Sequence, residues 1–249
     1  MEAERHSVRL NVWMTAVALP ALVLLISLGI WQLNRLEWKE ALIAERAAGL
    51  AAEPVALKTV LRDGWEKHEF RRVYLEGNFR PDNFKLNTPI KVRKRPGYKL
   101  ITLFETLTGQ MVLVDRGWVP GTLKKDNLHT PSGKIALIGV LRSAGRKNSW
   151  VPDNVPEKDE WYFVDPRAMT LRNKNYNTRP FFIEVVPTPN PRNRLQVAES
   201  DRRGAWPMPL AFNAQQPNRH LEYAVTWFGL AATLVIIYIA FYWRRPTKH

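Results

Sequence analysis

The chain carries an uncharged apolar segment near each end, and these two segments constrain its structure more than any other feature. The first runs from Val12 to Leu33 and the second from Tyr223 to Trp243. About 20 residues of α-helix, rising 1.5 Å per residue, cross the hydrocarbon core of a bilayer. The sequence therefore predicts a transmembrane helix at each end.

The alternative for the first segment is a cleaved signal peptide. Signal peptides have a shorter apolar region, of roughly 7–15 residues, followed by small residues at the cleavage site. Here Trp31, Gln32 and Arg35 follow instead, so an uncleaved anchor is the better interpretation. Pro20 predicts a modest kink, and residues 41–50 are expected to continue this helix beyond the membrane.

Short basic tails flank the two segments at the chain ends, with Arg5 and Arg9 in the first and Arg244, Arg245 and Lys248 in the second. Such tails mark the cytoplasmic side of a membrane. We therefore expect transmembrane helices at 12–33 and 221–243, and an extracytoplasmic domain at 34–220. The expected location is a bacterial inner membrane, with both termini cytoplasmic and the domain periplasmic.

Charge and composition exclude several functions. The net charge is +14, which in a cytosolic domain would suggest nucleic acid; on the predicted side of the membrane we expect none. Anionic lipid, an acidic protein or an anionic ligand remain as partners. The densest basic run, Lys91–Arg95, is interpreted as a solvated loop. The chain has no cysteine, and no two of its histidines have the spacing of a metal-binding helix.

The segment between the anchors has the alternation of β-strands. Residues 71–79 alternate apolar and charged side chains, and 98–107 and 110–119 flank a Thr-Gly turn as a hairpin, with Val112, Val114, Arg116 and Trp118 expected on one face. Further strands are expected at 134–141 and 181–186, and a short helix after Asp165, which is followed by proline. This predicts a β-dominated α+β domain of five to seven strands. It contains no motif for a catalytic nucleophile or a phosphate loop.

Three motifs, in order along the chain, resemble the Surfeit-locus (Shy-like) family of cytochrome c oxidase assembly proteins. They are LGIWQLNRLEWKEALI at residues 28–43, VLVDRGWVP at 112–120 and PNRHLEYAVTWFGLA at 217–231. Leu103 and Arg219 depart from the residues common in that family. The resemblance implies a non-enzymatic protein that helps to assemble an aa3-type haem-copper oxidase and binds haem a through His220. It also implies the oxidase catalytic subunit as partner, with haem a synthase as a further candidate.

The spacing of residues on the two helices indicates how haem a would be held. His220, Tyr223 and Trp227 lie within about 60° of one another on the second helix. On the first helix Gln32, Arg35 and Lys39 form a polar stripe beside Trp31 and Trp38. We expect the macrocycle between the helices, with iron at His220 and the propionates near Arg35 or Lys39. The lipid bilayer is the surrounding partner.

Simpler interpretations of these residues stay open. His220 would then cap a helix, the tryptophans would form an interfacial belt, and the two cations would extend to lipid headgroups. For Arg116 and Trp118 we favour a structural role in the hairpin. Two other functions also remain, namely a scaffold for an oxidase intermediate that holds no haem, and a membrane-anchored enzyme with a deep polar pocket.

Overall fold

The computed structural model describes residues 2–124, 128, 130–145, 147, 149–171, 178–186, 206–210 and 218–243. Contacts between residues divide the chain into two compact units. One comprises Met1–Glu45 with Ala214–His249, and the other comprises Arg46–Asn213. The basic tail after Trp243 lies outside the described residues.

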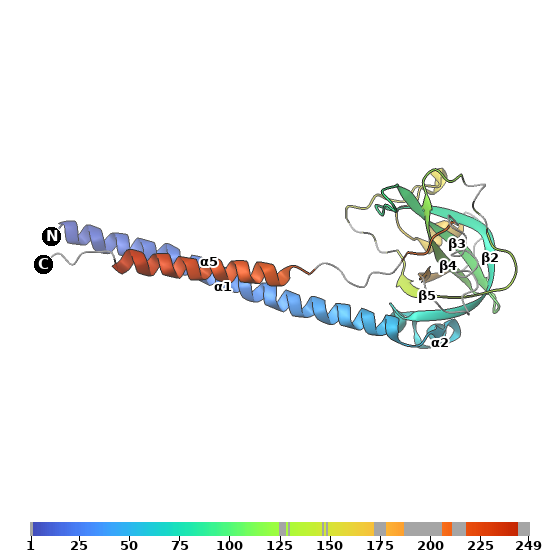
Figure 1. Cartoon of the computed structure of the whole chain (residues 1–249), viewed down its shortest axis with the longest axis horizontal. Helices are drawn as coiled ribbons and strands as arrows, with labels where there is room; N and C mark the ends of the chain where they lie inside the picture. Colours follow the sequence, from blue (N-terminus) through green and yellow to red (C-terminus); the bar gives the residue numbers. More distant parts are fainter. Residues whose placement is uncertain are drawn as a thin grey trace. The chain divides into compact units, whose positions relative to one another are not determined.

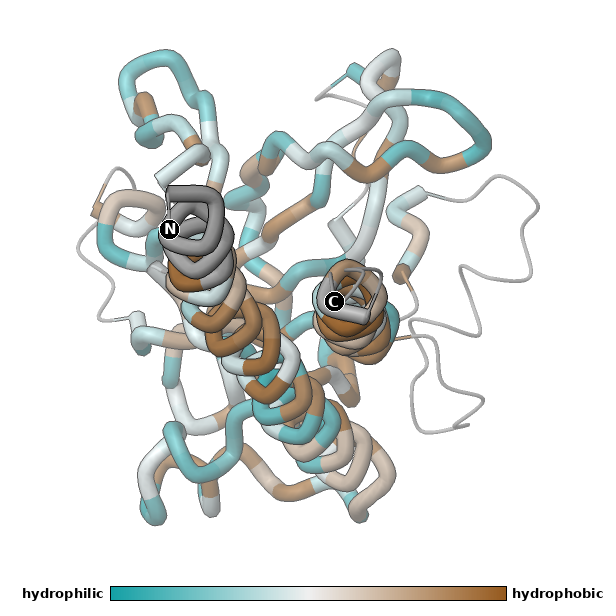
Figure 2. Tube along the Cα trace, turned by 90° about the vertical axis from the view of Figure 1, so that its left-hand side faces the viewer, coloured by the Kyte–Doolittle hydropathy of each residue, from teal (hydrophilic) through white to brown (hydrophobic). Residues whose placement is uncertain are grey.

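Two long helices make up the first unit. Helix α1 spans Glu2–Ala51 and includes the predicted continuation beyond residue 40, and α5 spans His220–Trp243. They run side by side in opposite directions (Figure 1). Apolar residues (brown) cover α5 and the middle of α1, and hydrophilic residues (teal) follow in the later turns of α1 (Figure 2). Only 6% and 11% of their most apolar windows are buried, which is unlike the core helices of a soluble protein. Both helices are long and apolar enough to cross a membrane.

Small residues bring the two helices into close contact. A Cβ atom on Gly29 would lie 2.7 Å from the ring of Phe228, so the absence of a side chain at this position admits the phenyl ring. On α5, Ala224 and Ala231 are buried two turns apart on one face. Small residues are common where membrane helices pack, because they let the backbones approach.

The second unit is a small β-barrel. Its strands are β1 (Val55–Ala56), β2 (Arg72–Asn87), β3 (Gly97–Thr106), β4 (Met111–Pro120), β5 (Ile135–Ser143) and β6 (Thr178–Val185). Their order is β1-β2-β3-β4-β6-β5, and β2 also pairs with β5. This extra pairing closes five strands into a barrel, with β1 beside β2. Strand β2 can serve both neighbours because its first half pairs with β5 and its second half with β3.

Three apolar clusters stabilise the barrel, of which the two larger ones cover opposite faces of β3 and β4. The first takes side chains from all five barrel strands and from α2 (Leu57–Asp63), so it fills the interior. The second lies on the other face of β3 and β4, under Trp161, Val164 and Met169. Strand β4 is buried along its whole length, because both of its faces are covered.

Most of the predicted elements are present. The hairpin of β3 and β4 forms antiparallel as expected, and the helix after Asp165 is α3 (Pro166–Leu171). The Asp165 carboxylate accepts hydrogen bonds from the backbone N–H groups of Arg167 and Ala168, both at 3.1 Å, as an N-cap should. Helix α2, the short helices η1 (Trp65–His68) and η3 (Pro156–Lys158), and the length of β2 were not predicted.

The single face predicted for β4 is wrong at its end. The pairing with β3 shifts between Ile101, the partner of Asp115, and Lys99, the partner of Trp118. Gly117, at φ 121°, stands within this bulge. Because cross-strand partners share a face, the extra residue places Trp118 on the face of Asp115.

Candidate functional site

A hydrogen bond between the two helices joins two of the predicted site residues. His220 Nδ1 lies 2.7 Å from Gln32 Oε1. His220 is the first residue of α5 and is half-buried, whereas Gln32 is buried to 9% exposure in the middle of α1. A second inter-helix bond, between Thr15 Oγ1 and Tyr238 OH at 2.7 Å, lies farther along the pair. The two bonds fix the antiparallel register of α1 and α5.

The Gln32 bond determines which imidazole nitrogen of His220 carries the proton. An amide oxygen only accepts hydrogen bonds, so Nδ1 must donate the proton. In the neutral ring Nε2 is then unprotonated and has a lone pair for a metal. A hydrogen bond of this kind also orients a metal-binding imidazole. The Gln32 bond thus holds the His220 ring in one orientation, with Nε2 free of a proton.

The aromatic residues of the predicted site lie on the outside of the helix pair. Tyr223 is 53% exposed and Trp31 is 56% exposed, while Trp227 is half-buried. Such rings can contact either lipid or the face of a flat apolar ligand. The structure therefore leaves both interpretations of these three residues open.

The predicted cations follow Gln32 on α1. Arg35 is exposed, and its guanidinium carbon lies 3.9 Å from the ring centroid of Trp38. Lys39, one turn farther on, is half-buried. A cation stacked on an indole keeps its N–H groups available at the edge for a carboxylate.

The macrocycle was predicted to lie between the helices, where the Gln32–His220 bond crosses from α1 to α5. Ala224, one turn into α5, is buried at this level, whereas Tyr223 beside it is exposed. The described residues contain no group of three or more His, Asp or Glu side chains that could hold a metal ion, so His220 would act alone.

The central motif in β4 is a buried structural unit, as expected for Arg116 and Trp118. Trp118 is 1% exposed, and its backbone exchanges hydrogen bonds of 2.7 and 2.8 Å with Met208. Its ring meets that of Trp206 edge-to-face at 5.2 Å. A side chain at Gly117 would collide with the Met208 carbonyl oxygen, 2.2 Å from its Cβ. The motif thus binds residues 206–210 to the barrel.

A buried charge cluster on β3, β4, β5 and β6 was not predicted. Lys99 Nζ lies 2.8 Å from both Asp115 Oδ2 and Glu184 Oε1, and Arg142 Nη1 lies 2.9 Å from Glu184 Oε2. Burial alone would lower the pKa of Lys99, but the two carboxylates outweigh it and hold this pKa above its ordinary value. These residues are far apart in the sequence, and only the sheet register brings them together.

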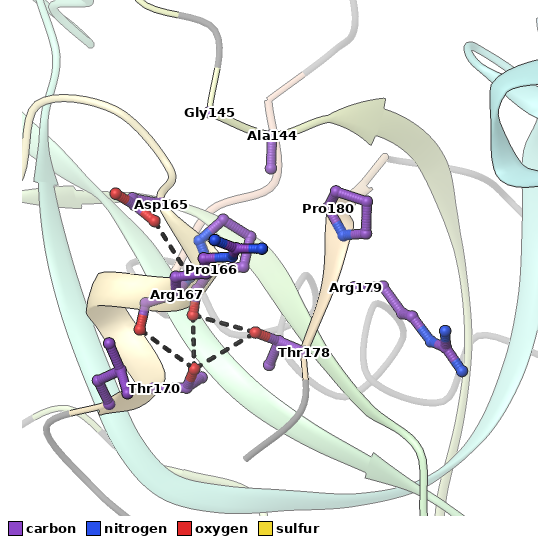
Figure 3. Close-up of a pocket in the computed structure, with 10 residues that line it drawn as sticks. Ala144, Gly145, Asp165, Pro166, Arg167, Thr170, Thr178, Arg179 and Pro180 are labelled. Carbon is purple, nitrogen blue, oxygen red and sulfur yellow. Dashed lines mark hydrogen bonds between the residues drawn. The ribbon is translucent and has the colours of Figure 1, made fainter. Parts of the chain in front are cut away.

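The barrel unit also has a cavity of about 610 Å³ beside α3 and β6. Its polar groups are engaged in holding the fold (Figure 3). The Thr170 and Thr178 hydroxyls donate to the Pro166 carbonyl oxygen at 2.6 and 3.0 Å, and Asp165 caps the helix. Among the described lining residues no nucleophile stands beside a base, so this cavity gives the enzyme hypothesis no support.

Comparison with known proteins identifies the family. The model of the SURF1 family matches residues 19–232. A SURF1-like protein of Monosiga brevicollis is 30% identical over 87% of this chain and 83% of its own length. A SURF1-like protein of Rickettsia prowazekii is 28% identical over 90% of this chain and 87% of its own length. Surfeit locus protein 1 of Rattus norvegicus is 29% identical over 88% of this chain and 72% of its own length. The family match covers the barrel unit and parts of both helices, and this chain belongs to the SURF1 family.

Proposed function

We propose that this protein is an assembly factor for an aa3-type haem-copper oxidase, which binds haem a and assists its insertion into the catalytic subunit. Family membership and the three motifs support the assembly role. The observation that carries haem binding is the hydrogen bond from His220 Nδ1 to Gln32, because it leaves Nε2 as an oriented metal ligand.

Each remaining residue has a defined part in this proposal. Tyr223 and Trp227 contact the macrocycle from α5, and Trp31 contacts it from α1. Arg35 and Lys39 pair with the propionates, because a carboxylate binds most strongly to a charged donor. Bound haem a would supply the iron that His220 ligates; the protein itself performs no chemistry on it.

The same proposal includes the membrane. Helices α1 and α5 span the inner membrane of a bacterium, and the barrel unit is periplasmic. In that arrangement His220 and Arg35 stand near the periplasmic surface, where propionates can stay in water while the ring is in an apolar environment. The partners are the catalytic subunit of the oxidase and, as a further candidate, haem a synthase.

The competing proposal is a scaffold that binds the oxidase intermediate without haem. An absorption spectrum separates the two. We expect the full-length protein, expressed together with the enzymes of haem a synthesis and purified in detergent, to carry haem a with a Soret band. Colourless protein from cells that do make haem a would contradict haem binding and favour the scaffold.

A further inference from the structure

A tight, strongly basic hairpin projects from the barrel between β2 and β3. We define the basic hairpin as residues 88–96. Val92 and Arg95 exchange backbone hydrogen bonds of 3.1 and 2.9 Å. The two residues between them, Arg93 and Lys94, have φ angles of 50° and 64°. Two central residues with positive φ form a type I′ turn.

Arg93 and Lys94, the two central residues of this turn, are unfavourable in its positive-φ conformation. Asn-Gly or Asp-Gly is usual at the two central positions, because a Cβ disfavours positive φ. Arg93 and Lys94 thus hold the turn at a cost in free energy. Strained residues that persist on a surface suggest a function for their side chains.

The base of the basic hairpin is held by the family motif in β4. Trp118 Nε1 donates to the Ile90 carbonyl oxygen at 3.3 Å, and Gly121 N donates to the Pro96 carbonyl oxygen at 3.1 Å. A Cβ on Gly97 would lie 2.4 Å from the Trp118 ring, so the chain passes directly over the indole. These contacts fix the position of the turn on the barrel.

The charges of the basic hairpin are not neutralised by the residues that the structure describes. Lys91, Arg93, Lys94 and Arg95 are all exposed, and the structure gives none of them an ion pair with another described residue. Ile90 beside them is 39% exposed. Four exposed cations and an exposed apolar side chain therefore lie within residues 90–95, on a turn that the barrel supports.

We propose that the basic hairpin is a docking surface for an acidic face of a folded partner protein. An anionic lipid surface attracts polybasic segments whatever their conformation. A surface of fixed carboxylates, in contrast, gains from cations whose positions are already set, because less entropy is lost on binding. The strain at Arg93 and Lys94 and the support from Trp118 favour the protein partner.

The identity of the partner rests on the proposed function, which makes the oxidase catalytic subunit the probe. The full-length protein is placed in nanodiscs of neutral phosphatidylcholine. Because the chain has no cysteine, Pro89→Cys gives a unique thiol for a fluorescent label beside the charges. The label then reports a titration with purified catalytic subunit at low and high salt.

Two double variants separate charge from turn geometry. Arg93→Asn with Lys94→Gly keeps the type I′ turn and removes two charges, whereas Arg93→Lys with Lys94→Arg keeps both charges. We expect the first to bind the subunit about tenfold more weakly at low salt, with a smaller difference at high salt. The second should bind like the wild type.

Three results would overturn the docking proposal. The first is an Asn-Gly variant that binds the catalytic subunit as tightly as the wild type does. The second is a charge-retaining variant that binds as weakly as the Asn-Gly variant. The third is a wild type that does not bind the subunit. A separate experiment, without the catalytic subunit, uses nanodiscs rich in phosphatidylglycerol. A label response there that disappears in the Asn-Gly variant would assign the surface to lipid and overturn the proposal. Haem content, measured on the same samples, reports the haem site separately.

Discussion

Gln32 is the residue that gives His220 its properties as a ligand. It is buried, and its side chain reaches from α1 to the first residue of α5. In the first motif, Gln32 therefore contributes to the proposed site more directly than Trp31 does. An amide at this position is costly to bury unless it is hydrogen-bonded, so His220 and Gln32 stabilise each other.

Changing Gln32 should alter haem binding without removing the ligand. Gln32→Leu leaves Nδ1 without an acceptor, so neither the ring orientation nor the tautomer is fixed, and haem affinity should fall by about 10–100-fold. Gln32→Glu keeps an acceptor and should retain haem with a lower reduction potential. Haem titration and redox potentiometry of the full chain measure both effects. Wild-type affinity in Gln32→Leu would show that the hydrogen bond is irrelevant.

Lys99 is the central residue of the buried charge cluster, and its loss should destabilise the barrel. Lys99→Met leaves the buried Asp115 without a cation and Glu184 with Arg142 alone, and should cost about 3–5 kcal/mol of unfolding free energy. Lys134→Met is the matched control, because the Lys134–Glu76 pair is largely exposed and should be worth about 0–1 kcal/mol. Denaturant unfolding in detergent measures both. Equal losses would contradict the role given to burial.

The raised pKa of Lys99 also sets the pH range of this stabilisation. A lysine whose folded pKa exceeds its unfolded value, about 10.4, contributes its full stability below that pH. The contribution is lost as pH rises through the folded pKa. The difference in stability between wild type and Lys99→Met should therefore stay constant across neutral pH and shrink only in strong alkali.

Among the elements, β4 has the most consequences for the rest of the domain. It lies between β3 and β6, contributes Asp115 to the charge cluster, and turns Trp118 outward through the bulge at Gly117. Trp118 then supports both the segment around Met208 and the basic hairpin. One motif thus sets the position of two neighbouring surface segments.

Truncating Trp118 should destabilise the barrel and loosen the basic hairpin. Trp118→Ala removes a buried indole and should cost about 3–5 kcal/mol. Trp150→Ala is the control, because Trp150 is 95% exposed and its change should stay within about 0.5 kcal/mol. Thermal unfolding and hydrogen exchange over residues 88–96 report the two effects. An unchanged melting temperature in Trp118→Ala would refute the structural role.

Local patterns predicted the elements better than their arrangement. The apolar runs, the alternation in β3 and β4 and the Asp165-Pro166 helix start are short-range signals, and each is found in the structure. Closure of the barrel through β2 and β5 depends on pairing between distant segments. The bulge at Gly117 was not predicted either, because the alternation of apolar and polar residues along a strand gives no sign of a one-residue shift in pairing.

In the candidate site, too, the sequence predicted local features but not the packing between distant segments. The prediction that His220, Tyr223 and Trp227 share one face of the helix needed only the helical period. Packing between α1 and α5 depends on small residues, Gly29 and Ala224, and on contacts between segments far apart in the sequence. The hydrogen bond from Gln32 to His220 arises from this packing, so no local pattern in the sequence predicts it.

At the scale of the whole molecule, two apolar helices flank a basic barrel unit. The proposed function requires both termini to be cytoplasmic and the barrel unit to be periplasmic. A reporter active only in the cytoplasm, inserted within residues 127–133 between β4 and β5, should be inactive. An active reporter there would reverse the topology.

The central claim, that His220 ligates haem a, is tested most directly by the haem content of His220→Ala. Wild-type and variant proteins are expressed together with haem a synthesis, purified in detergent, and compared by haem per chain and by the Soret band. His220 is half-buried at the start of α5, so the variant should fold. We expect it to lose haem a or to show a shifted Soret band, because Nε2 is gone. Wild-type stoichiometry with an unchanged Soret band in His220→Ala would contradict the account.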